Sequence, residues 1–166
     1  MLLGTALIAS YGGVPLIYMG DEIALTNDYS YLHNPGHAHD SRWLHRPFMD
    51  WDRVRRAETN PASAAGRVLH GTRHILAQRK ATPQIHGGYP TRILDTGTTT
   101  LFAFARIAPT GPLVCLFNFT ENWQDVPLDW LHDAGVTQFR DALSDALLSL
   151  TNDIYSVPPY GRVWIT

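Results

Sequence analysis

The segment Gly13-Val-Pro-Leu-Ile-Tyr-Met-Gly-Asp-Glu22 joins an unbroken apolar run to a pair of carboxylates. Residues 14–19 are apolar at every position, which is typical of a strand that is buried on both faces of a parallel sheet. Pro15 is tolerated in such a strand only near its start. Asp21 and Glu22 would follow the carboxyl end of the strand, where parallel α/β folds build their sites. The segment therefore predicts one strand of a parallel α/β fold.

The residues before and after this strand predict a helix and a long loop. Residues 1–11 read as a short apolar helix that ends at Gly12-Gly13. Residues 23–59 show no clean periodicity, and an irregular stretch of that length is usually a functional loop. It has room for a short helical segment near residues 51–57.

Residues 60–82 carry the clearest helical pattern of the chain. Asn60 is a favourable N-cap, and Pro61 fits the first helical position. One apolar stripe recurs at the spacing of 3.6 residues that a helix buries, and it consists of Ala65, Val68, Leu69, Thr72 and Leu76. Pro83 stops the helix. Strand, loop and helix together form one unit of a parallel α/β fold.

From Gly87 onward the pattern changes to short apolar segments separated by turn signals, which indicates an antiparallel β-sandwich. The expected strands cover residues 101–106, 113–119, 123–127, 137–143, 146–150 and 161–165. The expected fold class is therefore α/β plus all-β.

The α/β part is too short to close by itself. A (β/α)8 TIM barrel needs about 250 residues, whereas the whole chain has 166. The apolar start of the chain lacks the basic leader and the cleavage region of a secretory signal. We therefore expect a fragment of an α/β enzyme with a β-domain attached, and we expect Met1 to lie inside a longer gene product.

The composition excludes several classes of protein. An apolar content of 45% is too high for a disordered chain, and no apolar run is long enough to span a membrane. The net charge of −2 leaves no electrostatic footprint for nucleic acid. Cys115 is the single cysteine, so it forms neither an internal disulfide nor a thiolate metal cage.

Two groups of polar residues suggest chemistry that their spacing does not support. Asp21 and Glu22 are adjacent, and neighbouring strand residues point to opposite faces, so they cannot flank one bond. We expect one of them to cap the following loop and the other to fix it by hydrogen bonds. A second group, His33, His37, His39 and Asp40, could bind zinc only if the loop folded back. No helix aligns these ligands, so we expect solvated histidines and no metal or other cofactor.

Arg42 lies among aromatic residues in Asp40-Ser-Arg-Trp-Leu-His-Arg46. An arginine in a long loop above a strand end can hold a carboxylate through two parallel hydrogen bonds. A surface salt bridge is equally compatible with the pattern. Asn118-Phe119-Thr120 matches a glycosylation sequon, but it ends an apolar strand, and we interpret the match as incidental.

Gly13–Glu22 resembles the eighth barrel strand of the α-amylase family of retaining enzymes that act on α-glucosides. Three further stretches are similar to the amylosucrase and sucrose hydrolase branch: Gly20-Asp-Glu-Ile-Ala-Leu-Thr-Asn-Asp28, Asp40-Ser-Arg-Trp-Leu-His-Arg-Pro47 and Pro61-Ala-Ser-Ala-Ala-Gly66. Val157-Pro-Pro-Tyr-Gly-Arg-Val-Trp164 resembles the last strand of that branch, and Asn118-Phe119-Thr120 is similar to an Asn-Phe-Ser/Thr motif of the C-terminal domain.

This resemblance implies two domains. Residues 1–85 would be the C-terminal end of the catalytic barrel, with the end of helix 7, strand 8, the long loop 8 and helix 8. Residues 86–166 would be the C-terminal β-sandwich.

The resemblance also implies a parent enzyme that takes sucrose, forms a β-glucosyl-enzyme and passes glucose to an α-glucan acceptor. The nucleophilic Asp, the acid/base Glu and the stabilising Asp of the family are expected before Met1, so no catalytic residue is expected in this chain. Arg42 is the one site residue carried over. The arginine of Ser-Arg-Trp in amylosucrases pairs with an upstream aspartate at the closed base of the glucosyl pocket.

Other functions fit the same residues. Sucrose hydrolase, which releases glucose and fructose, and other α-glucosidases of the family share most of the pattern. In a different class, the β-domain would be a non-catalytic sugar-binding or structural module. Exposed tryptophans on one face of the sandwich would favour sugar binding, but Trp123, Trp130 and Trp164 are dispersed in the sequence.

Overall fold

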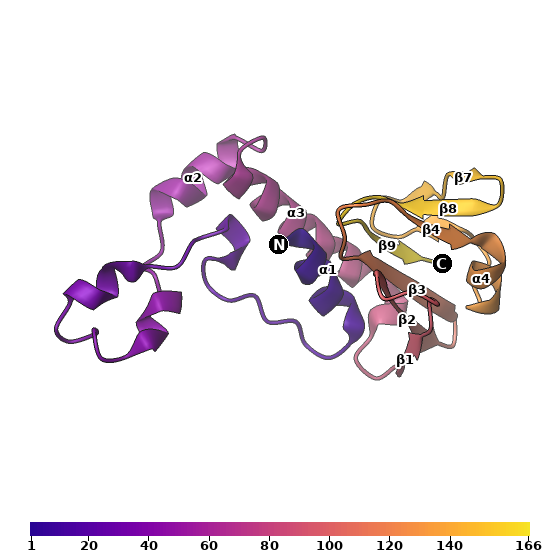
Figure 1. The fold of residues 1–166 in the computed structure, drawn as a ribbon, viewed down its shortest axis with the longest axis horizontal. Coiled ribbons are helices and arrows are strands. Elements are labelled where there is room, and N and C mark those ends of the chain that lie inside the picture. Colours follow the sequence, from indigo (N-terminus) through magenta and orange to yellow (C-terminus); the bar gives the residue numbers. More distant parts are fainter. The chain divides into compact units, whose positions relative to one another are not determined.

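The computed structural model describes all residues from Met1 to Thr166. The chain divides into two compact units. We call the first, Met1 with Leu16–Arg73, the loop unit, and the second, Leu2–Pro15 with His74–Thr166, the sheet unit. In Figure 1 the irregular part of the loop unit is indigo to purple, and the strands of the sheet unit run from pink to yellow. Each unit has a core of its own, and the two are described in turn.

The loop unit consists of short helical turns followed by longer helices. The turns are η1 (Asp21–Ile23), η2 (Tyr29–His33) and η3 (Ser41–His45), and the helices are α2 (Trp51–Thr59) and the first part of α3 (Ala64–Ala81). A small core of Ile23, Ala57, Ala65 and Leu69 joins η1, α2 and α3. The Arg53 side chain reinforces it, because Nε donates to the Ile23 carbonyl at 3.0 Å and Nη2 to the Ala24 carbonyl at 2.7 Å.

The strand expected over residues 14–19 does not form, and the prediction was wrong for this chain. The segment is extended but pairs with no strand. Val14 is 94% exposed and Leu16 79% exposed. A strand of a parallel sheet needs neighbours that hydrogen bond along both edges. All strands of this chain pair antiparallel with one another, so no such neighbour is available.

The helix expected over residues 60–82 begins four residues late. Asn60 is the C-cap of α2, where its N–H donates to the Arg56 carbonyl, and it is not the N-cap of α3. Ser63 takes that role, since its hydroxyl accepts from the Gly66 N–H at 3.0 Å. A Cβ at position 66 would lie 2.1 Å from the Asn60 carbonyl oxygen. Glycine therefore allows the close turn between the two helices, and Pro61 belongs to that turn.

The sheet unit contains two antiparallel sheets. The larger has the strand order β1-β2-β3-β9-β5-β6, with β1 (Thr91–Leu94), β2 (Leu101–Ala108), β3 (Gly111–Asn118), β9 (Arg162–Ile165), β5 (Arg140–Asp141) and β6 (Ala146–Leu147). The smaller has the order β4-β8-β7, with β4 (Gln124–Pro127), β8 (Ile154–Val157) and β7 (Leu150–Thr151). The short helix α4 (Leu128–Asp133) follows β4. The expected antiparallel β-domain is confirmed, whereas α4, β1 and β8 were not expected.

Both faces of the larger sheet are covered. On one face Ala103 and Leu116 share a core with Val126 and Val157 of the smaller sheet. On the other face a second cluster joins Phe104, Cys115, Phe117 and Trp164 to Ala6 and Ala9 of α1 (Leu2–Tyr11) and to Ile75 of α3. Alternate residues of a strand point to opposite faces, which separates Phe104 from Ala103. The helix α1 ends at Gly12 and Gly13, both at positive φ, as the sequence predicts.

The fold is thus mostly antiparallel sheet with few helices. A transmembrane helix needs about 20 predominantly apolar residues, and no helix of this chain meets that requirement.

Candidate functional site

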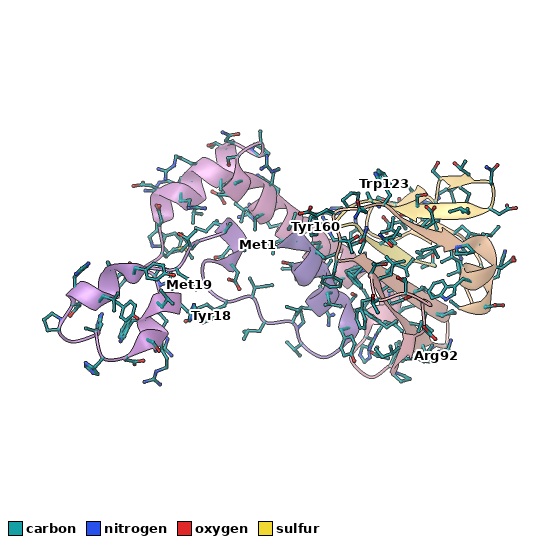
Figure 2. The ribbon with its side chains drawn as sticks, viewed as in Figure 1. Met1, Tyr18, Met19, Arg92, Trp123 and Tyr160 are labelled. Carbon is teal, nitrogen blue, oxygen red and sulfur yellow. The ribbon has the colours of Figure 1, made fainter.

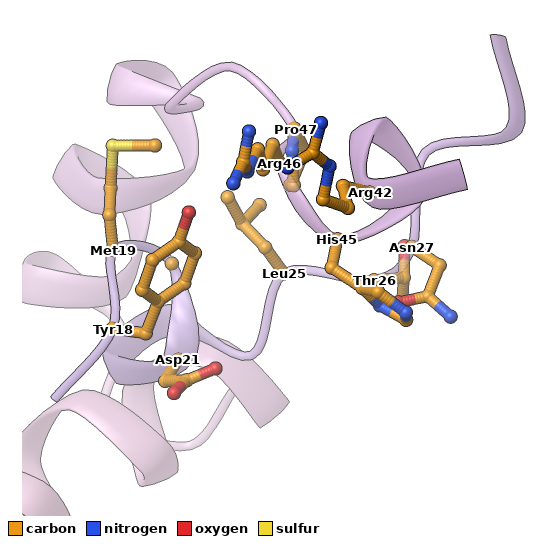
Figure 3. Close-up of a pocket in the computed structure, with 11 residues that line it drawn as sticks. Tyr18, Met19, Asp21, Leu25, Thr26, Asn27, Arg42, His45, Arg46 and Pro47 are labelled. Carbon is orange, nitrogen blue, oxygen red and sulfur yellow. The ribbon is translucent and has the colours of Figure 1, made fainter. Parts of the chain in front are cut away.

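A cavity of about 390 Å³ opens within the loop unit (Figure 3). Two stretches of chain line it, the segment from Tyr18 to Asn27 and the segment from Arg42 to Pro47. The lining residues are Tyr18, Met19, Gly20, Asp21, Leu25, Thr26, Asn27, Arg42, His45, Arg46 and Pro47. Of the side chains that the sequence singled out, Asp21 and Arg42 line the cavity, while Glu22 and Asp40 hydrogen bond to residues that line it.

The first wall is a tight turn around Gly20. The Leu25 N–H donates to the Gly20 carbonyl at 2.9 Å, and the Glu22 carboxylate accepts from the Gly20 N–H at 2.8 Å. Gly20 has a φ of 98°, and a Cβ there would lie 2.8 Å from Leu25 Cδ1, so glycine is required. Glu22 fixes the turn by its hydrogen bond, while Asp21 lines the cavity.

The second wall is the turn η3, which Asp40 caps. One carboxylate oxygen of Asp40 accepts from the Arg42 N–H at 3.0 Å and from Arg42 Nε at 2.8 Å. The other oxygen accepts from Arg42 Nη2 at 2.8 Å. Hydrogen bonds from Arg42 lower the pKa of Asp40 to about 2. Arg42 is therefore held through two parallel bonds from Nε and Nη2, and it also lines the cavity.

The contact is the surface salt bridge that the residue pattern left open, with Asp40 as a partner that was not predicted, whereas the resemblance to amylosucrases placed the partner upstream of Met1. The signal was present, because an aspartate two residues before a backbone N–H commonly accepts from it and so turns the chain. The same turn brings the arginine side chain back onto the carboxylate. Arg42 itself stays exposed, with 73% of its side-chain surface accessible.

Hydrogen bonds between the two walls fix their spacing. The Asp28 N–H donates to the Leu44 carbonyl at 2.9 Å, and a ring nitrogen of His45 lies 3.1 Å from the Asn27 side-chain oxygen. Behind η3 the rings of His37 and Trp43 stack with their centroids 3.7 Å apart.

The histidines of the loop do not converge on one point. His37 stacks on Trp43, and its Nδ1 lies 3.3 Å from the Asn34 amide nitrogen. Across the whole chain, no group of three or more His, Cys, Asp or Glu residues is placed to hold a metal ion. Asp40 accepts hydrogen bonds from Arg42 and His37 packs on Trp43, so the four residues His33, His37, His39 and Asp40 do not come together.

The cavity has a mixed polar and apolar lining, and Asp40 neutralises one of its two arginines. Arg42 and Arg46 line it together with a single carboxylate, that of Asp21. A retaining glycosidase uses two carboxyl groups about 5–5.5 Å apart, and the cavity offers no such pair. It can bind hydroxyl or anionic groups through its donors, but a hydrolytic step needs groups from elsewhere.

The C-terminal part of the chain is similar to a known family of domains. Residues 91–166 match the model of the amylosucrase C-terminal domain. The match begins at the first residue of β1 and ends with the chain, so it covers both sheets. This part of the sheet unit is therefore similar to the amylosucrase C-terminal domain.

The relatives of the whole chain are enzymes of the α-amylase family. Glucosylglycerate phosphorylase of Escherichia coli K12 is 26% identical over 165 residues, which cover 99% of this chain and 27% of the relative. Cyclic α-maltosyl-(1→6)-maltose hydrolase of Arthrobacter globiformis has the same fold, with a TM-score of 0.65 at 21% identity over 99% of this chain and 29% of that one.

Trehalose-6-phosphate hydrolase of Bacillus licheniformis matches with a TM-score of 0.66 at 16% identity, over 99% of this chain and 38% of that one. The chain thus spans between about a quarter and two fifths of the length of these relatives. They are glycoside hydrolases and transferases, and the amylosucrase-like match agrees with that class.

Proposed function

We propose that this chain is the C-terminal part of an amylosucrase-like enzyme, which transfers glucose from sucrose to an α-glucan and releases fructose. Residues 1–85 would complete the catalytic barrel, and residues 86–166 would be its β-sandwich. The observation that carries the proposal is the match of residues 91–166 to the amylosucrase C-terminal domain. The three stretches that resemble the amylosucrase branch lie before this domain and include both walls of the cavity.

In this proposal the cavity of the loop unit is part of the glucosyl pocket. Arg42 holds a carboxylate with a planar two-pronged contact, which an ammonium group cannot reproduce. In this chain that carboxylate belongs to Asp40, and in the complete enzyme the upstream aspartate at the closed base of the pocket would take its place. The nucleophile and the acid/base carboxyl group would come from upstream of Met1, so the 166-residue chain is expected to be inactive by itself.

The extended segment 14–19 also supports the proposal. It is apolar at every position but exposed, as expected for a barrel strand whose neighbours belong to the rest of the polypeptide. The exposed apolar side chains of this segment are Val14, Leu16, Tyr18 and Met19.

The test compares the 166-residue chain with the longer polypeptide encoded by the reading frame that continues upstream. Both are incubated with sucrose and glycogen, and fructose, glucose and newly formed α-glucan are measured. We expect the longer polypeptide to release fructose and to extend the glucan, and the short chain to do neither. Glucose and fructose in equal amounts without glucan would identify a sucrose hydrolase. No fructose release by the longer polypeptide would reject the use of sucrose.

The role of Arg42 has its own experiment in the longer polypeptide. Arg42→Ala is expected to lower kcat/KM for sucrose by about a hundredfold or more, because the pocket would lose its fixed base and misplace the reacting ring. Arg42→Lys should recover little of this loss. Arg55→Ala, which removes an exposed arginine that pairs with Asp52 on α2, is the matched control and should leave kcat/KM unchanged. Near-normal turnover in Arg42→Ala would remove Arg42 from the site.

A phosphorylase is a second candidate, because the curated relative glucosylglycerate phosphorylase matches nearly the whole chain. Arg46 also lines the cavity and takes part in no ion pair, so it could contact an anion. Adding inorganic phosphate to the sucrose or glucosylglycerate assay and measuring glucose 1-phosphate separates this candidate from glucosyl transfer to glucan.

A further inference from the structure

A second cavity, of about 600 Å³, lies within the sheet unit where the end of α3 passes into the turn η4 (Pro83–Ile85), and we call it the α3 cavity. It shares no residue with the cavity of the loop unit. Much of its wall is apolar and consists of Pro15, Leu76, Pro83, Ile85 and Tyr89. Three basic residues complete the lining together with Thr82 and Gly87, namely Arg79, Lys80 and His86. The cavity has the size of a site for a small organic molecule.

No carboxylate balances the basic residues of the α3 cavity. The chain carries no Asp or Glu over residues 1–20 or over residues 59–94, and every lining residue belongs to one of these two stretches. Arg79 and Lys80 also form no ion pair with a more distant part of the chain. The wall therefore carries an excess of positive charge, which an anionic ligand would neutralise.

Arg79 is held in place by the backbone and lies close to a second uncompensated cation. Its Nη2 donates to the Gly13 carbonyl at 2.6 Å, and its Nη1 donates to the Ala9 carbonyl. Burial lowers the pKa of Arg79. Burial also lowers the pKa of Arg106, and the charge of Arg79 lowers it further. Both arginines remain charged at neutral pH and repel each other, so a bound anion would relieve this repulsion.

His86 offers a hydrogen-bond donor to the α3 cavity. Its Nδ1 accepts from the Gly88 N–H at 3.1 Å, so the neutral imidazole carries its proton on Nε2. This Nε2–H group has no hydrogen-bond partner within the chain. The backbone of His86 is fixed, because Arg106 Nη2 donates to its carbonyl at 2.7 Å. A ligand therefore finds a free N–H group on a fixed backbone and has little chain to order.

We propose that the α3 cavity binds a small organic anion, in which an apolar ring or chain carries a phosphate or carboxylate head group. The head group would accept from Lys80 Nζ and His86 Nε2, close to the charge of Arg79. The apolar body would lie against the side chains of Leu76 and Tyr89. This site uses none of the residues that line the cavity of the loop unit, and it does not depend on the proposed function.

The test is direct binding of phenyl phosphate, a probe that joins an aromatic ring to an anionic head group. Saturation transfer from the 166-residue chain to the ring protons is followed by NMR and titrated to a dissociation constant. Inorganic phosphate lacks the apolar body and benzyl alcohol lacks the charge, so each should compete at least about tenfold more weakly than phenyl phosphate itself. Benzoate distinguishes the two head groups: competition as strong as that of phenyl phosphate assigns a carboxylate ligand, and weaker competition assigns a phosphate ligand. Either result supports an anion site.

Lys80→Gln removes one charge from the cavity and should lower the affinity for phenyl phosphate by about fivefold, because a charged hydrogen bond is lost. Lys80→Arg keeps the charge and should retain binding. Arg92→Gln is the matched control, since it changes the net charge equally at an exposed residue that forms no ion pair. Arg92 lies at the periphery of the sheet unit and outside the α3 cavity (Figure 2), so this variant should bind like the wild-type chain. Circular dichroism verifies that all three variants are folded.

Absence of saturation transfer to phenyl phosphate, or equal affinity in Lys80→Gln and wild type, would overturn the proposal. Equal competition by benzyl alcohol would also overturn it, because the ligand would then need no charge. The same titration on the longer polypeptide should give a similar dissociation constant. Loss of binding there would overturn the proposal and identify the cavity as a contact surface for another part of the polypeptide. These measurements require no turnover, so failure of the sucrose assay leaves them valid.

Discussion

The guanidinium of Arg42 donates two parallel hydrogen bonds to the carboxylate of Asp40, with Nε–Oδ1 and Nη2–Oδ2 distances of 2.8 Å each. The pair is exposed, yet it lowers the pKa of Asp40 to about 2. A carboxylate whose pKa falls on folding stabilises the folded chain at pH values above its unfolded pKa of about 3.9. That contribution disappears as the pH decreases through about 2.

The first prediction concerns this titration. Carboxyl carbon NMR of the chain should show Asp40 titrating near pH 2, and Arg42→Ala should move the midpoint up toward the ordinary range of aspartate. The control Arg55→Ala, which breaks a pair on α2, should leave the Asp40 midpoint unchanged. If Asp40 titrates normally in the wild-type chain, the pair is not formed in solution.

The second prediction concerns Arg106 of β2, which is 1% exposed and forms no salt bridge. Its guanidinium donates to the Tyr11 carbonyl at 2.8 Å, to the His86 carbonyl at 2.7 Å and to the Thr91 hydroxyl. Burial lowers its pKa, but arginine remains charged at neutral pH. Arg106 thus joins the end of α1 and the approach to β1 to the middle of the larger sheet.

Arg106→Met should lower the free energy of unfolding by roughly 2–3 kcal/mol, because buried carbonyl groups lose their donors. Arg106→Lys should also destabilise the chain, since one ammonium group cannot reach acceptors in three directions. Arg92→Ala, at an exposed arginine of the neighbouring strand, should change the free energy by less than about 0.5 kcal/mol. Urea unfolding followed by circular dichroism measures all three. A change in Arg106→Met as small as that in Arg92→Ala would contradict the bracing role.

The third prediction concerns Asn118, the asparagine of the apparent glycosylation sequon. Its side chain is fully buried, its oxygen accepts from the Thr120 N–H at 2.9 Å, and its nitrogen donates to backbone carbonyls. Such an amide has no room for a glycan. Asn118→Ala should destabilise the chain by about 2–3 kcal/mol, because buried donors and acceptors lose their partners. Asn122→Ala is the control, since only backbone atoms of that residue form hydrogen bonds.

Unfolding midpoints in urea compare the two asparagine variants. If the chain is expressed where glycosylation occurs, mass spectrometry should find no glycan on Asn118. A glycan on Asn118 of folded protein would contradict the buried placement.

The fourth prediction concerns the exposed apolar side chains of Val14 and Leu16. An open apolar segment with unpaired backbone groups favours association between copies. The double variant Val14→Ser, Leu16→Ser should reduce self-association of the 166-residue chain, measured by light scattering over a concentration series. It should leave the urea midpoint nearly unchanged, because the side chains lose no packing. Leu32→Ser, at another exposed leucine, should not reduce association.

The sequence predicts those elements whose burial is set by neighbouring residues. β2 and β3 follow from the apolar segments 101–106 and 113–119, and α1 from the glycines that end it. The start of α3 could not be predicted, because Asn60 and Ser63 are both good caps and the contact at Gly66 chooses between them. Local rules favoured Asn60, because Pro61 after it fits the first helical position.

The segment 14–19 and the cavity both depend on contacts with other parts of the polypeptide, which the sequence of one segment does not reveal. Residues 14–19 have the pattern of a doubly buried strand, but that pattern describes the surroundings that the segment needs and cannot supply its partners. The sequence predicts Arg42 as a substrate-binding residue, whereas its hydrogen bonds to Asp40 depend on the turn at η3. The tight turn at Gly20 and the hydrogen bonds between the two walls of the cavity depend equally on conformation.

The single thiol of the chain provides a built-in reporter. Cys115 is fully buried in the cluster that joins the larger sheet to α1, and burial raises its pKa. A thiol-reactive dye can therefore modify it only after this layer opens. Labelling rates under native conditions would measure how often α1 detaches from the sheet, and no cysteine would have to be introduced by mutation.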